Sequence, residues 1–167
     1  MLLKDAFQAA MDEWEWEDSI DHDESDDTYI MRTRYYIEGQ SYSFVILTDE
    51  DRKWITISVK SPVIIPEARR ADAAVLLNYF NCGIRIGKLC VHEDDGTVYY
   101  ENTMDIEGTE PAPMLFSNMR DRAGSAFDES RCNAIGALSF TKQKLRSIIE
   151  EYEESLKSDG DETPDEI

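Results

Sequence analysis

The stretch from Asn78 to Gly108 constrains the fold more than any other part of the sequence, because it reads as the end of a helix followed by a complete β-hairpin. Gly83 follows an aromatic helical segment, where helices commonly end on a left-handed residue. Leu89 and Val91 alternate with polar residues, as in a strand with one buried face. Asp95-Gly96 supplies a tight turn. No catalytic residue pattern appears in the stretch, which therefore predicts architecture rather than chemistry.

Three further strands are predicted upstream of this hairpin. Their apolar residues alternate and short turns join them, which makes an antiparallel meander over residues 29–37, 42–47 and 54–60. Apolar residues at helical spacing predict helices near residues 3–14, from Pro66, from Pro111 to Leu138, and from Leu145 to Leu156. The fold class is therefore α+β, an antiparallel sheet of meander plus hairpin with helices on one face, in the order αβββαββα(α).

Two helices carry more specific expectations. The helix that begins near Pro66 is expected to face the core with one apolar stripe, which comprises Ala68, Ala71, Val75 and Tyr79. The next helix contains Gly124 and Gly136, which weaken helices, so whether it is continuous stays open at this stage.

The formal charge of −19 is concentrated in two segments of the 167-residue chain. Residues 12–27 hold ten acidic residues and no Lys or Arg, and residues 150–167 hold nine acidic residues against Lys157 alone. The body between them is nearly neutral. Because nucleic-acid and anionic-membrane binders need clustered Lys and Arg, we expect neither kind of partner.

These patterns predict one domain over residues 1–157, with an acidic loop at 15–27 and an extra C-terminal helix at about 141–157. Residues 158–167 have almost nothing to bury, so we expect a disordered acidic tail there. The cysteines are odd in number and widely spaced (Cys82, Cys90 and Cys132), and the N-terminus lacks the layout of a signal peptide. We therefore expect reduced thiols and a cytoplasmic location.

Neither a metal site nor a cofactor site is predicted. An EF-hand loop that started at Asp21 would need Gly and Glu where Asp26 and Arg32 stand. Cys90 and His92 share one face of a strand, but i,i+2 neighbours rarely point at each other, and no third group orients them. A small cysteine-dependent enzyme that uses Cys90 is kept as the rival hypothesis.

The sheet face opposite the helices is the candidate protein-binding surface. If Ile55, Ile57 and Val59 point inward, their neighbours along the strand point outward. A Trp among hydroxyl and guanidinium groups is typical of an interaction surface. The residues assigned to this surface are Arg32, Arg34, Trp54, Thr56, Ser58 and His92. The alternative is an ordinary solvated face with one exposed aromatic side chain.

Several short motifs resemble those of the YbjN-domain family, the bacterial sensory transduction regulators. The motifs are Asn78-Tyr79-Phe80-Asn81-Cys82-Gly83, Ile84-Arg85-Ile86-Gly87, Asp95-Gly96, Asp105-Ile106-Glu107-Gly108 and the proline-bracketed link Pro62 to Arg70. The resemblance covers roughly residues 3–138 and is specific between 62 and 108. It implies an α+β fold like that of type III secretion chaperones, a homodimer and no enzymatic activity. The charged helix and acidic tail after Ser139 depart from the family pattern.

The leading functional hypothesis is a non-enzymatic protein-binding module of the YbjN type, either chaperone-like or a regulatory adaptor. Its client would be a protein or peptide whose identity the sequence does not give. Two alternatives stay open. One is the cysteine-dependent enzyme, and the other is a structural subunit that assembles through its C-terminal helix.

Deleting residues 158–167 should leave the midpoint of thermal unfolding unchanged. The segment has one apolar side chain, Ile167, which cannot offset the entropy of ordering the segment. Scanning calorimetry of the full and shortened chains measures the effect, and a loss of several degrees would show that the segment docks.

Overall fold

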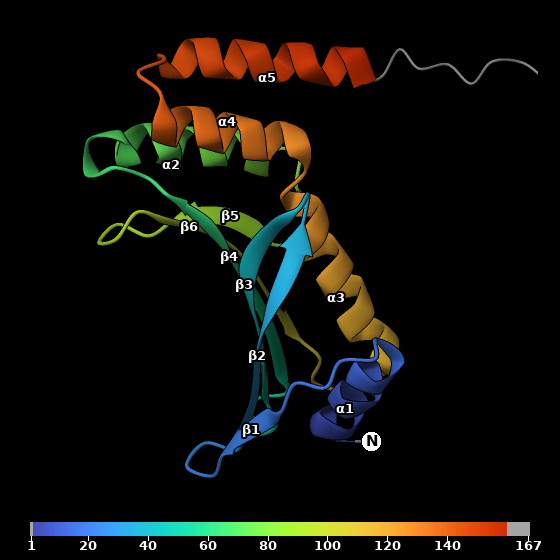
Figure 1. Ribbon diagram of the computed structural model, residues 1–167. Helices are drawn as coiled ribbons and strands as arrows, with labels where there is room; N and C mark the ends of the chain where they lie inside the picture. The colour runs from blue at the N-terminus through green and yellow to red at the C-terminus, as the bar shows by residue number, and fades with distance from the viewer. Residues whose placement is uncertain (1, 160–167) are drawn as a thin grey trace, which may run out of the picture.

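The computed structural model describes residues 2–159, and its centre is a six-stranded antiparallel sheet in the order β1-β2-β3-β4-β6-β5 (Figure 1). The elements follow in the order α1 (Leu3–Glu13), β1 (Ile20–Asp23), β2 (Thr28–Ile37), β3 (Gln40–Asp49), β4 (Trp54–Ile64), a 3₁₀ turn (Glu67–Arg69), α2 (Arg70–Asn81), β5 (Lys88–Val91), β6 (Thr97–Asp105), α3 (Pro113–Ala126), α4 (Glu129–Phe140) and α5 (Leu145–Asp159). The α+β class, the meander and the hairpin are confirmed. Within residues 2–159, no helix combines the length and the apolarity that a membrane span requires.

Strand β4 lies inside the sheet and sets its two faces. Ile55, Ile57 and Val59 are fully buried, while the residues between them are exposed or half-buried. This alternation follows from the pleat, which sends successive side chains to opposite faces. The sheet therefore has one apolar face and one face of mixed polarity.

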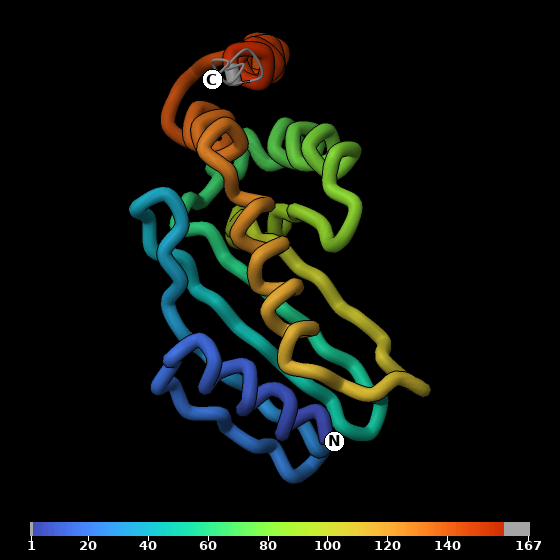
Figure 2. The backbone as a smooth tube through the Cα atoms, turned by 90° about the vertical axis from the view of Figure 1, so that its right-hand side faces the viewer, coloured from blue at the N-terminus to red at the C-terminus, as the bar shows by residue number. Residues whose placement is uncertain are grey.

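The helices lie on the apolar face, as the views in Figures 1 and 2 show. Phe7 of α1 stacks on Phe116 of α3 with ring centroids 5.1 Å apart, so these two helices share one layer over the sheet. Near the other end, Tyr42 of β3 packs against Phe127 at 4.9 Å, beneath α4. Helix α5 then packs outside α4 and α2, because Ile148 and Tyr152 are buried there.

The acidic segment at 15–27 was predicted to be a loop. This prediction was wrong, because the segment contains the edge strand β1. Ile20 pairs with Met31, and Asp23 pairs with Thr28. Trp16 packs edge-on against Phe44 at 5.6 Å, so even this acidic segment anchors an aromatic side chain in the core. The predicted strand order is corrected accordingly, because four strands precede α2.

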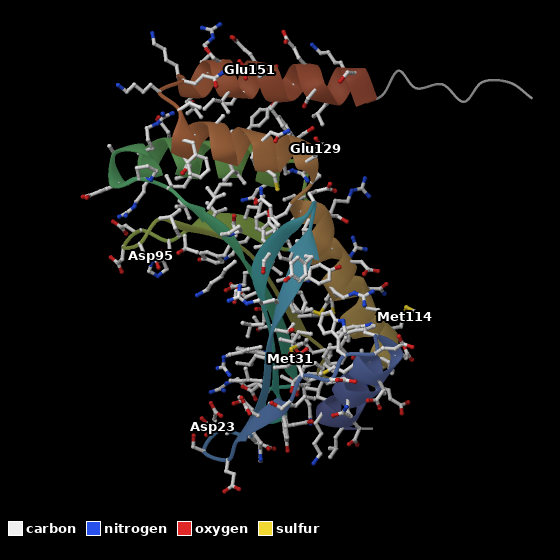
Figure 3. All side chains as sticks on the ribbon, viewed as in Figure 1. Asp23, Met31, Asp95, Met114, Glu129 and Glu151 are labelled. Carbon is white, nitrogen blue, oxygen red and sulfur yellow. The ribbon has the colours of Figure 1, made fainter. Side chains whose placement is uncertain are left out.

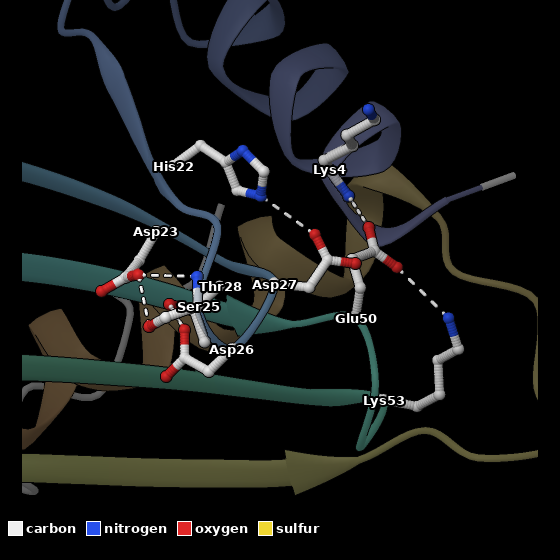
Figure 4. A network of polar contacts seen from close by, with 9 residues as sticks. All are labelled: Lys4, His22, Asp23, Ser25, Asp26, Asp27, Thr28, Glu50 and Lys53. Carbon is white, nitrogen blue, oxygen red and sulfur yellow. Dashed lines mark hydrogen bonds and ion pairs between the residues drawn. The ribbon is translucent and has the colours of Figure 1, made fainter.

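A local network holds the turn after β1 (Figure 4). Asp23 accepts hydrogen bonds from the Ser25 hydroxyl and backbone N–H, and these bonds lower the pKa of its carboxyl. Thr28 donates to Asp26 at 2.7 Å. Close to this turn, Glu50 accepts the Lys4 backbone N–H at 2.7 Å, which ties α1 to the β3–β4 turn.

The predicted third helix is broken between Ala126 and Glu129, so it forms α3 and α4. The break lies at neither glycine. Asp128 has extended backbone angles and accepts the Arg131 N–H at 2.8 Å, which makes Asp128 the N-cap of α4. The observed order is therefore αββββαββααα rather than αβββαββα(α).

The expected stripe on α2 was wrong. The buried residues of the helix are Ala73, Leu76, Leu77 and Phe80. Val75 and Tyr79 are 56% and 38% exposed. The buried stripe contains two leucines and a phenylalanine, which gain more from burial than the smaller or more polar side chains of the predicted stripe. The left-handed residue after the helix is Gly87, with φ +75°, rather than Gly83.

The extra C-terminal helix is α5, which begins at Leu145 and runs to Asp159, two residues past the predicted end at 157. The predicted disordered tail at 158–167 lies outside the described residues from position 160 on.

Gly96 to Ala should destabilise the protein more than Gly108 to Ala. Both glycines have left-handed backbone angles, with φ +74° and +77°. A Cβ at Gly96 would lie 2.1 Å from the Ile65 carbonyl oxygen, whereas nothing lies within 4 Å of a Cβ at Gly108. The control should lose about 1–2 kcal/mol of unfolding free energy, and Gly96→Ala about 1–3 kcal/mol more. Urea unfolding measures both, and equal losses would contradict this packing.

Candidate functional site

The outer face of the sheet carries the residues that we assigned to a protein-binding surface. Arg32 and Arg34 are exposed on β2, and Trp54, Thr56 and Ser58 project from the same face of β4. Strand β3 lies between these two strands. Its register places Val45 between Arg32 and Ser58, and Leu47 between Ile30 and Thr56.

These side chains form one continuous surface, which we call the outer patch (Arg32, Arg34, Val45, Leu47, Trp54, Thr56 and Ser58). Val45 and Leu47 are half-buried, so apolar area remains accessible at its centre. On the next strand, Thr103 shares a 2.9 Å hydrogen bond with Thr56, which fixes both hydroxyls. The arrangement combines an apolar centre with polar and cationic surroundings, as in many protein-binding surfaces.

Trp54 stands at one end of the patch and is 43% exposed. The Arg52 guanidinium lies over its ring, 5.8 Å from the centroid. Asp49 holds Arg52 through an ion pair of 2.7 Å. Burial opposes ionisation of Asp49, but the hydrogen bonds from Arg52 outweigh it and lower the pKa of the Asp49 carboxyl. Trp54 is thus an exposed aromatic side chain whose position is supported by a cation.

His92 does not join the outer patch. Trp54 is opposite Asp105 on β6, whereas the His92 N–H donates to the Thr97 carbonyl at the other end of that strand. From Thr97 to Asp105 the strand extends about 26 Å. His92 instead lies 3.6 Å from Asp95, which Figure 3 labels at the tip of the β5–β6 hairpin.

Strand β2 has an open edge, which sequence analysis did not detect. β1 pairs only with Thr28 to Met31, so within the described residues 2–159 nothing pairs as a strand with residues 32–37 on that side. A shallow depression of about 570 Å³ lies along this edge, lined by Asp18, Arg32, Thr33, Arg34 and Ser43. Exposed edges of this kind are templates for a further strand.

The opposite edge of the sheet is closed by a side chain. Asn81 donates to the Leu89 carbonyl at 2.9 Å and accepts the Leu89 N–H at 2.8 Å. Both hydrogen-bonding groups of the central residue of β5 are therefore occupied. The two edges thus differ, and the β2 edge is the more open to a partner.

The remaining candidate residues do not assemble a reactive centre within the described part of the chain. Cys90 lies opposite Tyr99 on β6, and no hydrogen bond joins Cys90 to His92 among residues 2–159. Burial, together with Cys90 and Glu101 nearby, raises the pKa of Tyr99. Over the same residues, no group of three or more His, Cys, Asp or Glu side chains is placed to hold a metal ion.

Val45, Leu47 and the open edge were missed for different reasons. Residues 42–47 are apolar at nearly every position, so alternation does not reveal which side chains face outward. The register with β4, set by the intervening turn, would have indicated Val45 and Leu47. The open edge depends on where β1 begins, and no pattern in the acidic sequence before Ile20 marks that point.

Comparison with known proteins gives a family and a related solved structure. The profile of the YbjN family, described as "Putative bacterial sensory transduction regulator", matches residues 4–131. No curated protein matches the chain. A solved structure, "Crystal structure of YbjN, a putative transcription regulator from E. coli", is 10% identical, covers 77% of this chain and 91% of its own, and superposes with a TM-score of 0.47.

Proposed function

The chain belongs to the YbjN family, and from this premise we propose that it is a non-enzymatic protein-binding module that acts as a regulatory adaptor or chaperone-like protein. The family is described as a regulator of sensory transduction and not as an enzyme. The observation that carries the proposal is the open edge of β2 beside the outer patch. A client of this module is an extended segment of another protein.

The open edge supports binding by strand addition. An extended peptide beside residues 32–37 would pair with backbone groups that have no strand partner on that side. Its alternate side chains would then face outward toward Arg32 and Arg34, which are exposed. Backbone pairing would supply affinity, and the side-chain contacts would supply specificity.

The outer patch extends this binding surface across the sheet. Val45 and Leu47 provide accessible apolar area, and Trp54 provides an aromatic anchor at the far end. Trp and Arg are the residues that most often dominate binding energies. The acidic segments flanking the domain favour clients that carry basic residues, because opposite charges speed encounter.

The cysteine-dependent enzyme remains the rival. The Cys90 thiol is half-buried and its nearest partner across the strands is Tyr99, a residue that does not act as a general base at neutral pH. The adaptor proposal accounts for the open edge, which an enzyme of this kind would not require. The three cysteines are unpaired, and we place the protein in the cytoplasm, where thiols stay reduced.

We further propose that the protein is a homodimer, as the family resemblance implies. Val75 and Tyr79, which belong to the stripe of α2 that was predicted to be buried, are exposed on the outside of the helix layer. Tyr79 donates to Glu153 of α5 at 2.6 Å, and Leu156 of α5 is 49% exposed. Exposed apolar residues on these two neighbouring helices offer a dimer surface, and the same surface would serve a structural subunit that assembles through α5.

Replacing Trp54 with Ala should weaken client binding by about 1 kcal/mol or more, because it removes the exposed aromatic anchor at the end of the outer patch. Replacing Cys90 with Ser should leave binding unchanged, because the thiol performs no reaction. His92→Ala is a second control on the same face, far from the patch. The client is first captured from lysate with the tagged full chain and identified by mass spectrometry. Titration calorimetry with the purified client then compares the variants.

The adaptor proposal would be wrong if Cys90→Ser abolished function while Trp54→Ala remained neutral and both variants folded. The enzyme hypothesis would then take its place.

Val75 to Asp should convert the dimer to a monomer, because a charge on this surface opposes apolar contact between two copies. Sedimentation equilibrium of the full chain at micromolar concentration measures the mass. Ala71→Asp is not a suitable control, since it lies on the same stripe, so Lys142→Asp is used instead. A monomeric wild-type protein would refute the dimer proposal.

A further inference from the structure

A small pocket lies where the loop after α2 meets the junction of α3 and α4. It has a volume of about 220 Å³, and the side chains that matter in its lining are Ile84, Arg85, Arg122, Ser125 and Arg131. Its volume is below the range of about 300–1,000 Å³ that is usual for drug-sized ligands. It would hold a small group rather than a large molecule.

The charge of this lining is opposite to that of the protein. The chain has 36 acidic and 17 basic residues, yet the pocket is lined by three arginines and no acidic residue. Arg85 and Arg122 form no hydrogen bond or ion pair with any residue in the range 2–159. Like charges repel one another, so an anion bound among three arginines of this strongly acidic protein would stabilise them.

Arg131 is the anchored member of the three, and its side chain is 15% exposed. One of its terminal nitrogens, Nη1, binds Asp128 Oδ2 at 2.5 Å and the Ser125 carbonyl at 3.1 Å. Its Nε is buried and has no partner in the described chain. A buried donor of a charged group that stays unpaired is costly, so the protein alone does not fully satisfy the Arg131 guanidinium.

The wall that carries Arg85 is held in place by Tyr100. The buried Tyr100 hydroxyl donates to the Ile86 carbonyl at 2.9 Å. A Cβ at Gly87 would lie 2.2 Å from the Tyr100 hydroxyl oxygen, so the glycine permits this close approach. Burial raises the pKa of Tyr100, and the positive charge of Arg122 opposes that rise, which places Arg122 beside the same anchor. The pocket is therefore built by packed residues.

We propose that this arginine pocket (Arg85, Arg122 and Arg131, with Ser125) binds an oxyanion, specifically a phosphate group. Guanidinium groups bind phosphate through paired, charge-assisted hydrogen bonds. Asp128 already pairs with Arg131, so the two remaining positive charges, those of Arg85 and Arg122, match the charge of a dianion. The phosphate is either free or carried on a small ester, and the pocket would bind the same phosphate group in both cases. The site is separate from the outer patch, so it does not depend on the proposed function.

The test is a titration of the full-length protein with inorganic phosphate at constant ionic strength, followed by the ¹⁵N–¹H resonances of residues 83–86, 122, 125 and 131. Saturable shifts confined to these residues are expected. Arg85→Gln and Arg122→Gln should each weaken binding about tenfold or more, as the loss of a hydrogen bond to a charged group does. Both side chains are exposed, so folding should be retained. Arg146→Gln on α5, which is 90% exposed, is the matched control and should bind like wild type.

Parallel titrations identify the source and the specificity. Tighter binding of phosphoserine than of inorganic phosphate would indicate a phosphate carried on an ester, and the reverse order would indicate free phosphate, both in support of the site. Acetate at equal ionic strength should bind much more weakly. No saturable shift, equal affinity for acetate and phosphate, or unchanged binding in both arginine variants would overturn the proposal.

Discussion

The architecture depends on the strict alternation of side chains along β4. Ile55, Ile57 and Val59 are buried on one face, and the helices lie on the side of this face, with α5 outside α4 and α2. On the other face, Trp54, Thr56 and Ser58 stay accessible, because the indole ring of Trp54 and the hydroxyl groups of the other two can remain in contact with water. A sheet that is apolar on one face only cannot form a sandwich with helices on both sides. The accessible face is therefore a consequence of the core.

The open edge of β2 has a related cause. In the chain that leads into β1, Trp16 is half-buried against the core, where its ring packs against Phe44 with centroids 5.6 Å apart. The chain reaches the sheet edge only at Ile20, opposite Met31. The part of β2 beyond Met31 is left without a partner on that side. At the other edge, Asn81 occupies the backbone of Leu89, so the packing of the chain directs any added strand to β2.

The sequence was sufficient to predict features that depend on local alternation and turn chemistry. The faces of β4, the hairpin at Gly96 and the family resemblance were all predicted correctly. The face of α2 was not, because this helix carries two apolar stripes, and the buried one is the stripe with the larger side chains Leu76, Leu77 and Phe80. Strand β1 escaped detection because acidic residues seldom mark a strand, and its pairing comes from β2.

The sequence predicted only part of the candidate site, because the alternation of side chains is a local signal. Arg32, Arg34, Trp54, Thr56 and Ser58 share one surface because alternation fixes the face. Alternation does not fix the distance along the sheet, and His92 lies at its other end. The arginine pocket joins a loop after α2 to two later helices, and its lining residues are separated by up to 48 positions in sequence, from Gly83 to Arg131. Such a site is visible only once the chain is folded.

Backbone hydrogen exchange in the free and client-bound protein tests the central claim most directly, namely that an extended client adds to the open edge of β2. The account predicts that amides within residues 32–37 become more protected when the client binds, while the Leu89 amide, already bound to Asn81, does not change. New protection at Lys88–Val91, or a bound client that leaves residues 32–37 unprotected, would contradict it.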